Sequence, residues 1–347
     1  MSVLVTGGAG YIGSHMVHRL RQHRRRVVVV DDLSSGTREA VPRDVPLVVA
    51  DVADRARTSE LIREHEVDAI IHFAARIQVG ESVVDPRRYW MGNVVATAAL
   101  LETALDAGVG TFILSSTAAV YGQPTSIPIT EDQPTVPVNP YGETKLAIEK
   151  MLASYAYAYP LRFAALRYFN AAGAAPDTTL VERHDPETHL IPIVLDAAAG
   201  RRPEVTIYGR DYPTPDGTCV RDYIHVVDLA DAHLAALAYL ERGGESGAFN
   251  LGTGQGHSVA EVVRTCRAVT RREITVAYGE RREGDPPVLV ASPSLAEQRL
   301  GWRARRSALE TIVDDAWRAH QREHGRSDDP TNATPPRRRN QEQPNAR

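Results

Sequence analysis

The chain has 347 residues, of which 43% are hydrophobic and 24% are charged. This composition lies in the usual globular range and excludes both wholesale disorder and a single short module. The 40 basic and 44 acidic residues give a formal net charge of -4, so no overall positive field exists to hold nucleic acid or an anionic membrane.

Cysteine usage and the first residues indicate the compartment. Cys219 and Cys266 cannot form a disulfide framework, the chain opens on M-S-V-L-V-T-G-G without a signal peptide, and no apolar run approaches the ~20 residues of a membrane span. We therefore expect a soluble, reduced, cytoplasmic protein. Only Lys145 and Lys150 are lysines among the 40 basic residues, so each lysine stands out.

The first 170 residues alternate short β-branched runs with amphipathic stretches, which predicts βαβ units and a parallel sheet. Strands are expected at residues 3–6, 27–30, 47–49, 69–73, 111–115 and 162–167, with helical patterns such as 12–22 and 94–107 between them. The predicted fold class is α/β, with a Rossmann-like doubly wound parallel sheet in residues 1–170.

The pattern changes after residue 170, where Pro and Gly become frequent, as in G-R-D-Y-P-T-P-D-G at 209–217. Residues 171–322 are predicted to form mainly a smaller C-terminal α/β substrate-binding lobe, interleaved with the first domain. From residue 323 to 347 the sequence has almost no apolar residues and no period, which predicts a disordered tail.

A glycine-rich turn follows the first expected strand. In T-G-G-A-G-Y-I-G at 6–13, Gly7, Gly10 and Gly13 permit a tight turn and a close approach of backbone to a pyrophosphate at a helix N-terminus. The second strand ends in Asp31 and Asp32, where a carboxylate would bind an adenosine ribose and repel a 2′-phosphate. This order of elements predicts a dinucleotide site that prefers NAD to NADP.

A second motif carries acid-base chemistry. Asn139 and Pro140 are typical of a helix start, and Tyr141 and Lys145 follow four residues apart on one helix face. A nearby ammonium and a cationic nicotinamide both favour the phenolate of such a tyrosine, which can then move a hydroxyl proton. The fifth expected strand runs into a Ser/Thr cluster ending at Thr117, whose hydroxyls could hold the reacting oxygen.

These motifs resemble the extended short-chain dehydrogenase/reductases, and within them the UDP-glucose 4-epimerases, over residues 2–320. The resemblance rests on T-G-G-A-G-Y-I-G, S-S-T-A-A-V-Y-G at 115–122, N-P-Y-G-E-T-K at 139–145, the long block at 208–230, F-N-L-G-T-G at 249–254 and R-R-E-G-D at 281–285. It implies an NAD-dependent isomerase that interconverts UDP-glucose and UDP-galactose through a 4-keto sugar and works as a homodimer. The N-acetyl sugars are a further candidate substrate pair.

The resemblance also assigns site residues. The catalytic set would be Tyr141, Lys145 and Thr117. The cofactor set would be Gly7, Gly10, Tyr11, Ile12, Gly13, Asp31, Asp32, Leu33, Ser34, Gly36, Asp51, Val52, Phe73, Ala74, Ala75, Asn93, Ser115, Tyr141, Lys145 and Tyr168. The substrate set would be Thr117, Tyr141, Asn170, His189, Leu190, Tyr208, Arg221, Arg282, Asp285 and Leu289.

Some positions depart from the family pattern. Where many members carry Lys near the cofactor pyrophosphate, this chain has Ile77 with Arg76 adjacent, and a substrate-contacting Asn of some members falls at His189. Leu289 stands where members restricted to the plain sugars carry a bulky Tyr, which predicts room for an N-acetyl group. We found no His/Cys/Asp cluster with metal spacing, so no metal is expected.

Three alternative functions share part of this sequence pattern. A nucleotide-sugar 4,6-dehydratase needs a further acid and base, normally an Asp-Glu pair directly after the Thr, but here Ala118 and Ala119 follow Thr117. A UDP-glucuronate 4-epimerase remains open, because the sequence does not show how the sugar C5 substituent is read. A non-catalytic dinucleotide sensor would have no use for Thr117, Tyr141 and Lys145 together.

Overall fold

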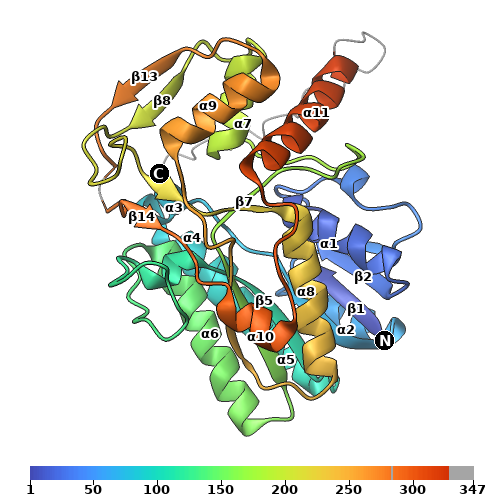
Figure 1. Cartoon of the computed structure of the whole chain (residues 1–347). Coiled ribbons are helices and arrows are strands. Elements are labelled where there is room, and N and C mark those ends of the chain that lie inside the picture. Colours follow the sequence, from blue (N-terminus) through green and yellow to red (C-terminus); the bar gives the residue numbers. More distant parts are fainter. Residues whose placement is uncertain (283, 328–347) are drawn as a thin grey trace, which may run out of the picture.

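The structure is a computed structural model that describes residues 1–282 and 284–327. Its centre is a seven-stranded sheet in the order β11-β6-β5-β4-β1-β2-β3, with every neighbouring pair parallel (Figure 1). The strands are β1 (Ser2–Thr6), β2 (Arg26–Asp31), β3 (Leu47–Val49), β4 (Val67–His72), β5 (Thr111–Thr117), β6 (Arg162–Tyr168) and β11 (Gly247–Leu251). The α/β doubly wound fold and the six expected strands are confirmed.

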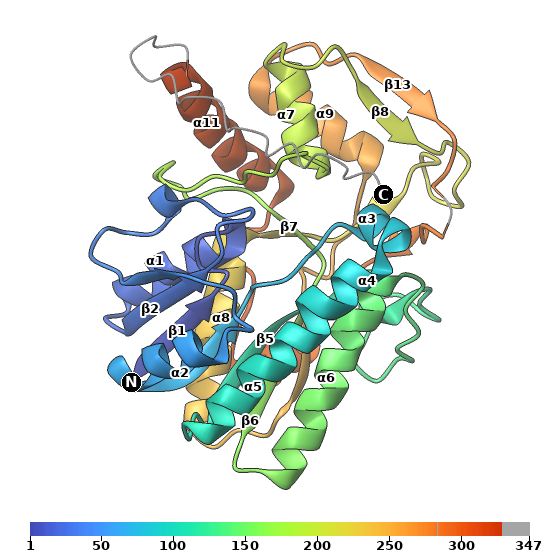
Figure 2. The same ribbon diagram turned by 180° about the vertical axis from the view of Figure 1, so that it is seen from behind.

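Helices cover both faces of this sheet because alternate strand residues point to opposite sides. Val3 and Val5 join one apolar core, whereas Leu4 joins the other. The first face is covered by α1 (Tyr11–Gln22), α8 (Val226–Glu241) and α10 (Ser294–Leu300). The second face is covered by α2 (Arg55–Glu64), α5 (Ala96–Asp106) and α6 (Pro140–Ala158). Figure 2 shows α5 and α6 side by side on that face.

Short helical elements connect these layers. They are the 3-10 turns η1 (Arg38–Ala40) and η3 (Ala118–Tyr121), the helices α3 (Val79–Val84) and α4 (Pro86–Tyr89), and the π-helix η2 (Trp90–Val95). The π-helix runs directly into α5, so the single helix expected at 94–107 is the end of a longer helical segment.

A smaller lobe lies beyond the carboxyl ends of the main strands (Figure 1). Its core is formed by α7 (Leu190–Ala198), α9 (Val259–Thr270), α11 (Leu309–Ser327) and the parallel pair β8 (Val205–Tyr208) and β13 (Val276–Gly279). Two small sheets join it to the main body: β7 (Asn170–Ala172) with β10 (Tyr223–His225), and β9 (Val220–Arg221) with β12 (His257–Ser258) and β14 (Val288–Leu289).

The later half of the chain alternates between the two parts. β11, α8 and α10 return to the main sheet, whereas α7, α9 and α11 build the lobe. A division at residue 170 stays a prediction. The prediction of a disordered tail from residue 323 is wrong for its first residues, since α11 continues to Ser327 and Glu323 pairs with Arg183. The rest of that prediction, residues 328–347, lies outside the described residues.

Over the described residues, none of the helices has the length and the apolar character needed to cross a lipid bilayer.

Candidate active site

A cavity of about 950 Å³ lies between the carboxyl ends of the main strands and the smaller lobe. Its walls include the glycine-rich turn, the ends of β4, β5 and β6, and residues of the lobe. Sheets of this type bind ligands where the strand order reverses, here between β1 and β4, so this is the expected position for a bound nucleotide. The volume is typical of a large ligand site.

The glycine-rich turn has no room for side chains. Gly7 has φ of +68°, and a Cβ added there would lie 2.6 Å from the Ala74 backbone nitrogen. A Cβ on Gly13 would lie 2.1 Å from the Gly7 carbonyl oxygen. Gly10 caps α1 without a side-chain hydrogen bond, so the free N–H groups of the first helical turn are available to an anion. The turn therefore fits a dinucleotide pyrophosphate.

Two carboxylates border the cavity at the end of β2. Asp31 accepts hydrogen bonds from the backbone nitrogens of Ala9 and Leu33, at 2.9 and 2.8 Å, and burial raises its pKa. Asp32 accepts from the Ser34 nitrogen at 2.9 Å. Asp31 thus holds the glycine-rich turn in place, and both side chains line the cavity. A 2′-phosphate at this position would meet their negative charge.

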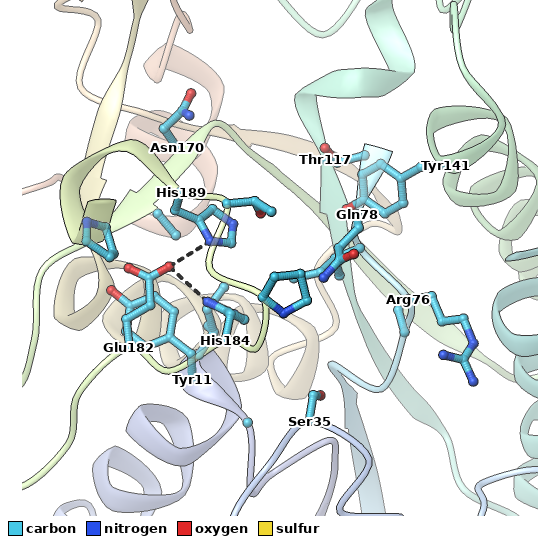
Figure 3. Close-up of a pocket in the computed structure, with 18 of the residues that line it drawn as sticks. Tyr11, Ser35, Arg76, Gln78, Thr117, Tyr141, Asn170, Glu182, His184 and His189 are labelled. Carbon is cyan, nitrogen blue, oxygen red and sulfur yellow. Dashed lines mark ion pairs between the residues drawn. The ribbon is translucent and has the colours of Figure 1, made fainter. Parts of the chain in front are cut away.

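Helix α6 brings Tyr141 to the cavity. Asn139 is its N-cap and accepts from the Gly142 nitrogen at 2.9 Å, as the sequence predicts. Figure 3 shows the Tyr141 ring beside Thr117 at the end of β5. Burial raises the pKa of Tyr141 to about 12, and a hydrogen bond with Thr117 opposes that shift. The two side chains therefore share a hydrogen bond at the cavity wall.

Lys145 lies behind this pair. Its Nζ donates to the Ser115 carbonyl oxygen at 2.9 Å, its side chain does not line the cavity, and burial lowers its pKa to about 8 while Glu149 raises it. Ser115 also shares a hydrogen bond with the Tyr168 hydroxyl. Lys145 therefore fixes the strand end that carries Ser115 and Thr117.

A buried ion pair supports the same strand from the next helical turn. Arg167 donates to both carboxylate oxygens of Glu149, at 3.0 and 3.1 Å from Nε, and its other side reaches the Tyr121 hydroxyl at 2.9 Å. Ser116 donates to the same carboxylate. This network ties α6 to β5 and β6, so Tyr141 and Thr117 are held by rigid elements.

The opposite wall comes from the smaller lobe. Arg221 pairs with Asp285, and the Arg282 guanidinium lies 4.2 Å from the Tyr208 ring centroid. All four side chains line the cavity, as do Asn170, His189 and Leu190. Two arginines at one wall offer planar donors for phosphate oxygens.

Five residues of the predicted sets do not line the cavity: Leu33, Gly36, Asn93, Lys145 and Leu289. Leu33 packs on the main core, and Leu289 packs with Phe169 in a small apolar cluster. Gly36 lies against Ala9, where a Cβ would be 2.6 Å from its carbonyl carbon. Asn93 is buried. Its side chain accepts a hydrogen bond from the Arg76 backbone nitrogen at 2.8 Å and donates one to the Arg76 carbonyl oxygen at 3.1 Å. These residues position the walls rather than form them.

Other cavity residues were not assigned from the sequence. Arg76, Gln78, Glu182 and His184 all line the cavity, and in Figure 3 the first two lie on the same side of the view as Tyr141, with Glu182 and His184 on the other side. A Cβ on Gly92 would lie 3.2 Å from the Arg76 Nε, so that glycine makes room for the arginine. The glutamate and the histidine belong to a repeated Glu-x-His pattern at 182–189, which was the signal available in the sequence.

Comparison with known proteins places the site in context. Residues 3–252 match the model of the NAD dependent epimerase/dehydratase family. A UDP-glucose 4-epimerase of Halalkalibacterium halodurans is 50% identical over 93% of this chain and 96% of its own length. A UDP-glucose 4-epimerase of Brucella ovis, solved with NAD, is 49% identical with a TM-score of 0.89, covering 91% of this chain and 97% of that one. The Bifidobacterium longum enzyme, solved with NAD+ and UDP, is 37% identical with a TM-score of 0.88, covering 94% and 99%.

Proposed function

The chain belongs to the NAD dependent epimerase/dehydratase family, and from this premise we propose that it interconverts UDP-glucose and UDP-galactose with NAD as its cofactor. It is an NAD-dependent isomerase, since its relatives at about half identity over nearly their whole length are UDP-glucose 4-epimerases. The observation that carries the proposal is the hydrogen-bonded pair of Tyr141 and Thr117 in one cavity with the Gly7–Gly13 turn.

Each residue near the reacting sugar carbon has a role that follows from its position. Tyr141 takes the proton of the sugar 4-hydroxyl and returns it, with Thr117 orienting the reacting oxygen. Lys145 holds the end of β5 through Ser115, and its positive charge favours the phenolate. NAD, when bound in this cavity, would supply the reversible hydride-acceptor chemistry that oxidation and reduction at the sugar C4 require.

The walls supply the binding groups. The first turn of α1 and the acids Asp31 and Asp32 would hold the cofactor, and Arg76 takes the place of the basic residue that is missing at Ile77. Arg221 and Arg282 would bind the diphosphate of the sugar nucleotide. In this chain, whose net charge is -4, such local arginines are what attracts an anion.

The position after Thr117 argues against a dehydratase. Thr117 accepts from the Ala119 nitrogen at 3.1 Å and so begins the 3-10 turn η3. The next two side chains, Ala118 and Ala119, are methyl groups that cannot carry protons to and from C5 and C6.

The activity is tested by incubating the purified protein with UDP-galactose, UDP-N-acetylgalactosamine and UDP-galacturonic acid and separating the products by sugar. We expect UDP-glucose from the first. The nucleotide released on denaturation should be NAD, and turnover should need no external reductant. Release of NADP, or conversion of the uronic acid alone, would contradict the proposal.

Substrate breadth is a finer proposal. Leu289 pairs with Arg221 in the β14–β9 ladder and packs against the same small apolar cluster as Phe169, which lines the cavity. Leucine is smaller than the tyrosine of the restricted members, so we expect turnover of both plain and N-acetylated sugars. The ratio of kcat/KM for the two substrates should shift toward the plain sugar in Leu289→Tyr by the ~1–3 kcal/mol typical of one methylene-sized change. An unchanged ratio would rule out Leu289 as the determinant.

A homodimer through the helices of the second face is proposed as well. Met91 and Val95 on η2 and Tyr157 near the end of α6 are exposed at 55%, 48% and 95%, and exposed apolar groups favour a protein partner. Light scattering should give the mass of two chains, falling toward one chain in Val95→Arg. The cytoplasmic location stays a prediction.

A further inference from the structure

The segment between β7 and α7 gathers four potential metal ligands. Glu182, His184, Glu187 and His189 come from two Glu-x-His pairs separated by two residues. Each offers one ligand atom, and these atoms all lie within 4.8 Å of one another. Half of this group is glutamate, so it differs from the His, Cys and Asp clusters typical of metal motifs in a sequence.

Each of the two histidine Nδ1 atoms lies close to both carboxylates. The Nδ1 atom of His189 lies 3.1 Å from Glu182 and 2.9 Å from Glu187, and that of His184 lies 3.4 and 3.3 Å from the same carboxylates. In a tetrahedral zinc site with bonds of about 2.0–2.1 Å, neighbouring ligand atoms are separated by roughly 3.3 Å. The four His–Glu separations, 2.9–3.4 Å, lie around that edge length, with Glu187 presenting Oε1 to His189 and Oε2 to His184.

Hydrogen bonds from the two imidazoles cannot reach both carboxylates at once. Each Nδ1 carries at most one hydrogen, which points at one oxygen, yet each faces two carboxylates at similar distances. Glu182 is 6% exposed, and the two imidazoles are its only ion-pair partners among the described residues. One divalent cation would neutralise both carboxylates and bind both imidazoles in their neutral form.

The group also borders the nucleotide cavity. Three of the four residues, Glu182, His184 and His189, line this cavity. The His184 ring lies edge-on to the Tyr11 ring, with 6.3 Å between the ring centroids. Tyr11 is the first residue of α1 and donates to the Gly173 carbonyl oxygen at 2.7 Å. Figure 3 shows Glu182 between the two imidazoles with Tyr11 beside them. A metal here would fix the 182–189 segment against the cofactor end of the site.

We propose that Glu182, His184, Glu187 and His189 form a four-coordinate site for a divalent transition-metal cation of the zinc class. Two imidazole nitrogens disfavour magnesium and calcium, which prefer oxygen ligands, and two carboxylates complete a donor set that zinc accepts. The site is independent of the epimerase proposal, because the metal would order a wall segment and take no part in hydride or proton transfer.

A second group supplies the matched control. Asp196, His320 and His324 also bring their ligand atoms together, on α7 and α11. It offers three donors instead of four, and the His320 Nε2 atom lies 2.9 Å from Asp196. His320→Gln removes a ligand from this second group, whereas His184→Gln removes one from the proposed site and keeps a hydrogen-bond donor beside Glu187.

The test is titration of the EDTA-treated, NAD-loaded protein with zinc chloride, followed by calorimetry, with no sugar nucleotide present. We expect one tight zinc site per chain, unchanged in His320→Gln and weakened at least ~100-fold in His184→Gln and Glu182→Gln, since even residues that only orient a ligand contribute ~10–100-fold. Cobalt chloride added to the wild type should give the intense visible bands of a tetrahedral ion, which needs no variant to fold.

Wild-type affinity no greater than that of His184→Gln would overturn the proposal. Loss of the tight site in His320→Gln alone would move the metal to the second group and overturn it equally. Epimerase activity measured in the same samples separates the two proposals, because the protein can bind zinc without turnover or turn over without zinc.

Discussion

At the scale of single residues, the surroundings of Tyr141 favour the protonated form of its phenol. Burial raises its pKa to about 12, and the Thr117 hydrogen bond only partly opposes this. The residues around Tyr141 therefore keep its hydroxyl protonated. The positive charge that draws the proton away must come mainly from the oxidised nicotinamide, so we infer that Tyr141 becomes an effective base only when NAD+ occupies the cavity.

Tyr141→Phe should lower kcat by ~10²–10⁴-fold, because one general acid-base group is lost. The melting temperature should change little, since only a hydroxyl is removed. Tyr157→Phe on the same helix is the control, because that side chain is 95% exposed and should retain normal turnover. Near-normal activity in Tyr141→Phe would remove this residue from the mechanism.

The two lysines allow an equally direct comparison. Lys145→Ala deletes a buried charge and leaves the Ser115 carbonyl oxygen without its donor, which should cost ~1–3 kcal/mol of stability. Activity should fall by roughly 10²-fold and NAD should be retained less well. Lys150→Ala, on the exposed side of α6, should match the wild type in turnover, unfolding and NAD content. Equal behaviour of the two variants would mean that Lys145 has no special role.

At the scale of elements, the start of α6 couples stability to catalysis. Asn139 caps the helix two residues before Tyr141, and its side chain accepts from Gly142 at 2.9 Å. Asn139→Ala should reduce the free energy of unfolding by about 1 kcal/mol and also lower kcat, because the first turn carries the phenol. Asn139→Asp retains a capping oxygen and should recover most of both quantities. Urea denaturation and steady-state kinetics on the two variants measure this; a loss of stability without loss of kcat would uncouple the cap from the site.

Elements with a strong local signal could be predicted from the sequence. The glycine-rich turn, the strand that precedes it and the Asn139 cap are specified by neighbours in the chain, and the structure has them as expected. The roles of Asn93 and Lys145 were only half predictable, since both residues bind backbone groups that lie far away in the sequence. The spatial grouping of the side chains at 182–189 depends on how an irregular loop folds back on itself. Periodicity in the sequence does not predict the conformation of such a loop.

At the scale of the whole molecule, three buried histidines should make the fold sensitive to acid. Burial lowers the pKa of His15 and His233 to about 4 and that of His72 to about 3. The unfolded chain takes up these protons near pH 6.5 and the folded chain does not, so their contribution is complete above that pH. It is lost as the pH falls from about 6.5 toward 4, at up to ~1.4 kcal/mol per pH unit for each group.

Urea denaturation at about pH 7.5 and about pH 5 tests this loss of stability. In His233→Gln the free energy of unfolding should change less with pH, because one fewer proton is taken up on unfolding. The exposed His23→Gln should leave this pH dependence unchanged. A stability that is level across this range would mean that the three rings are not kept neutral by the fold.

The scarcity of lysine has a practical consequence. Lys145 is 1% exposed, and Lys150 is the other lysine of the chain. An amine-selective fluorophore should therefore attach to the folded protein at Lys150 and at the terminal amine, and to no other side chain. The first of these sites lies on the helix that carries Tyr141, so one labelling reaction places one reporter on that helix and one at the terminal amine, without any engineered cysteine.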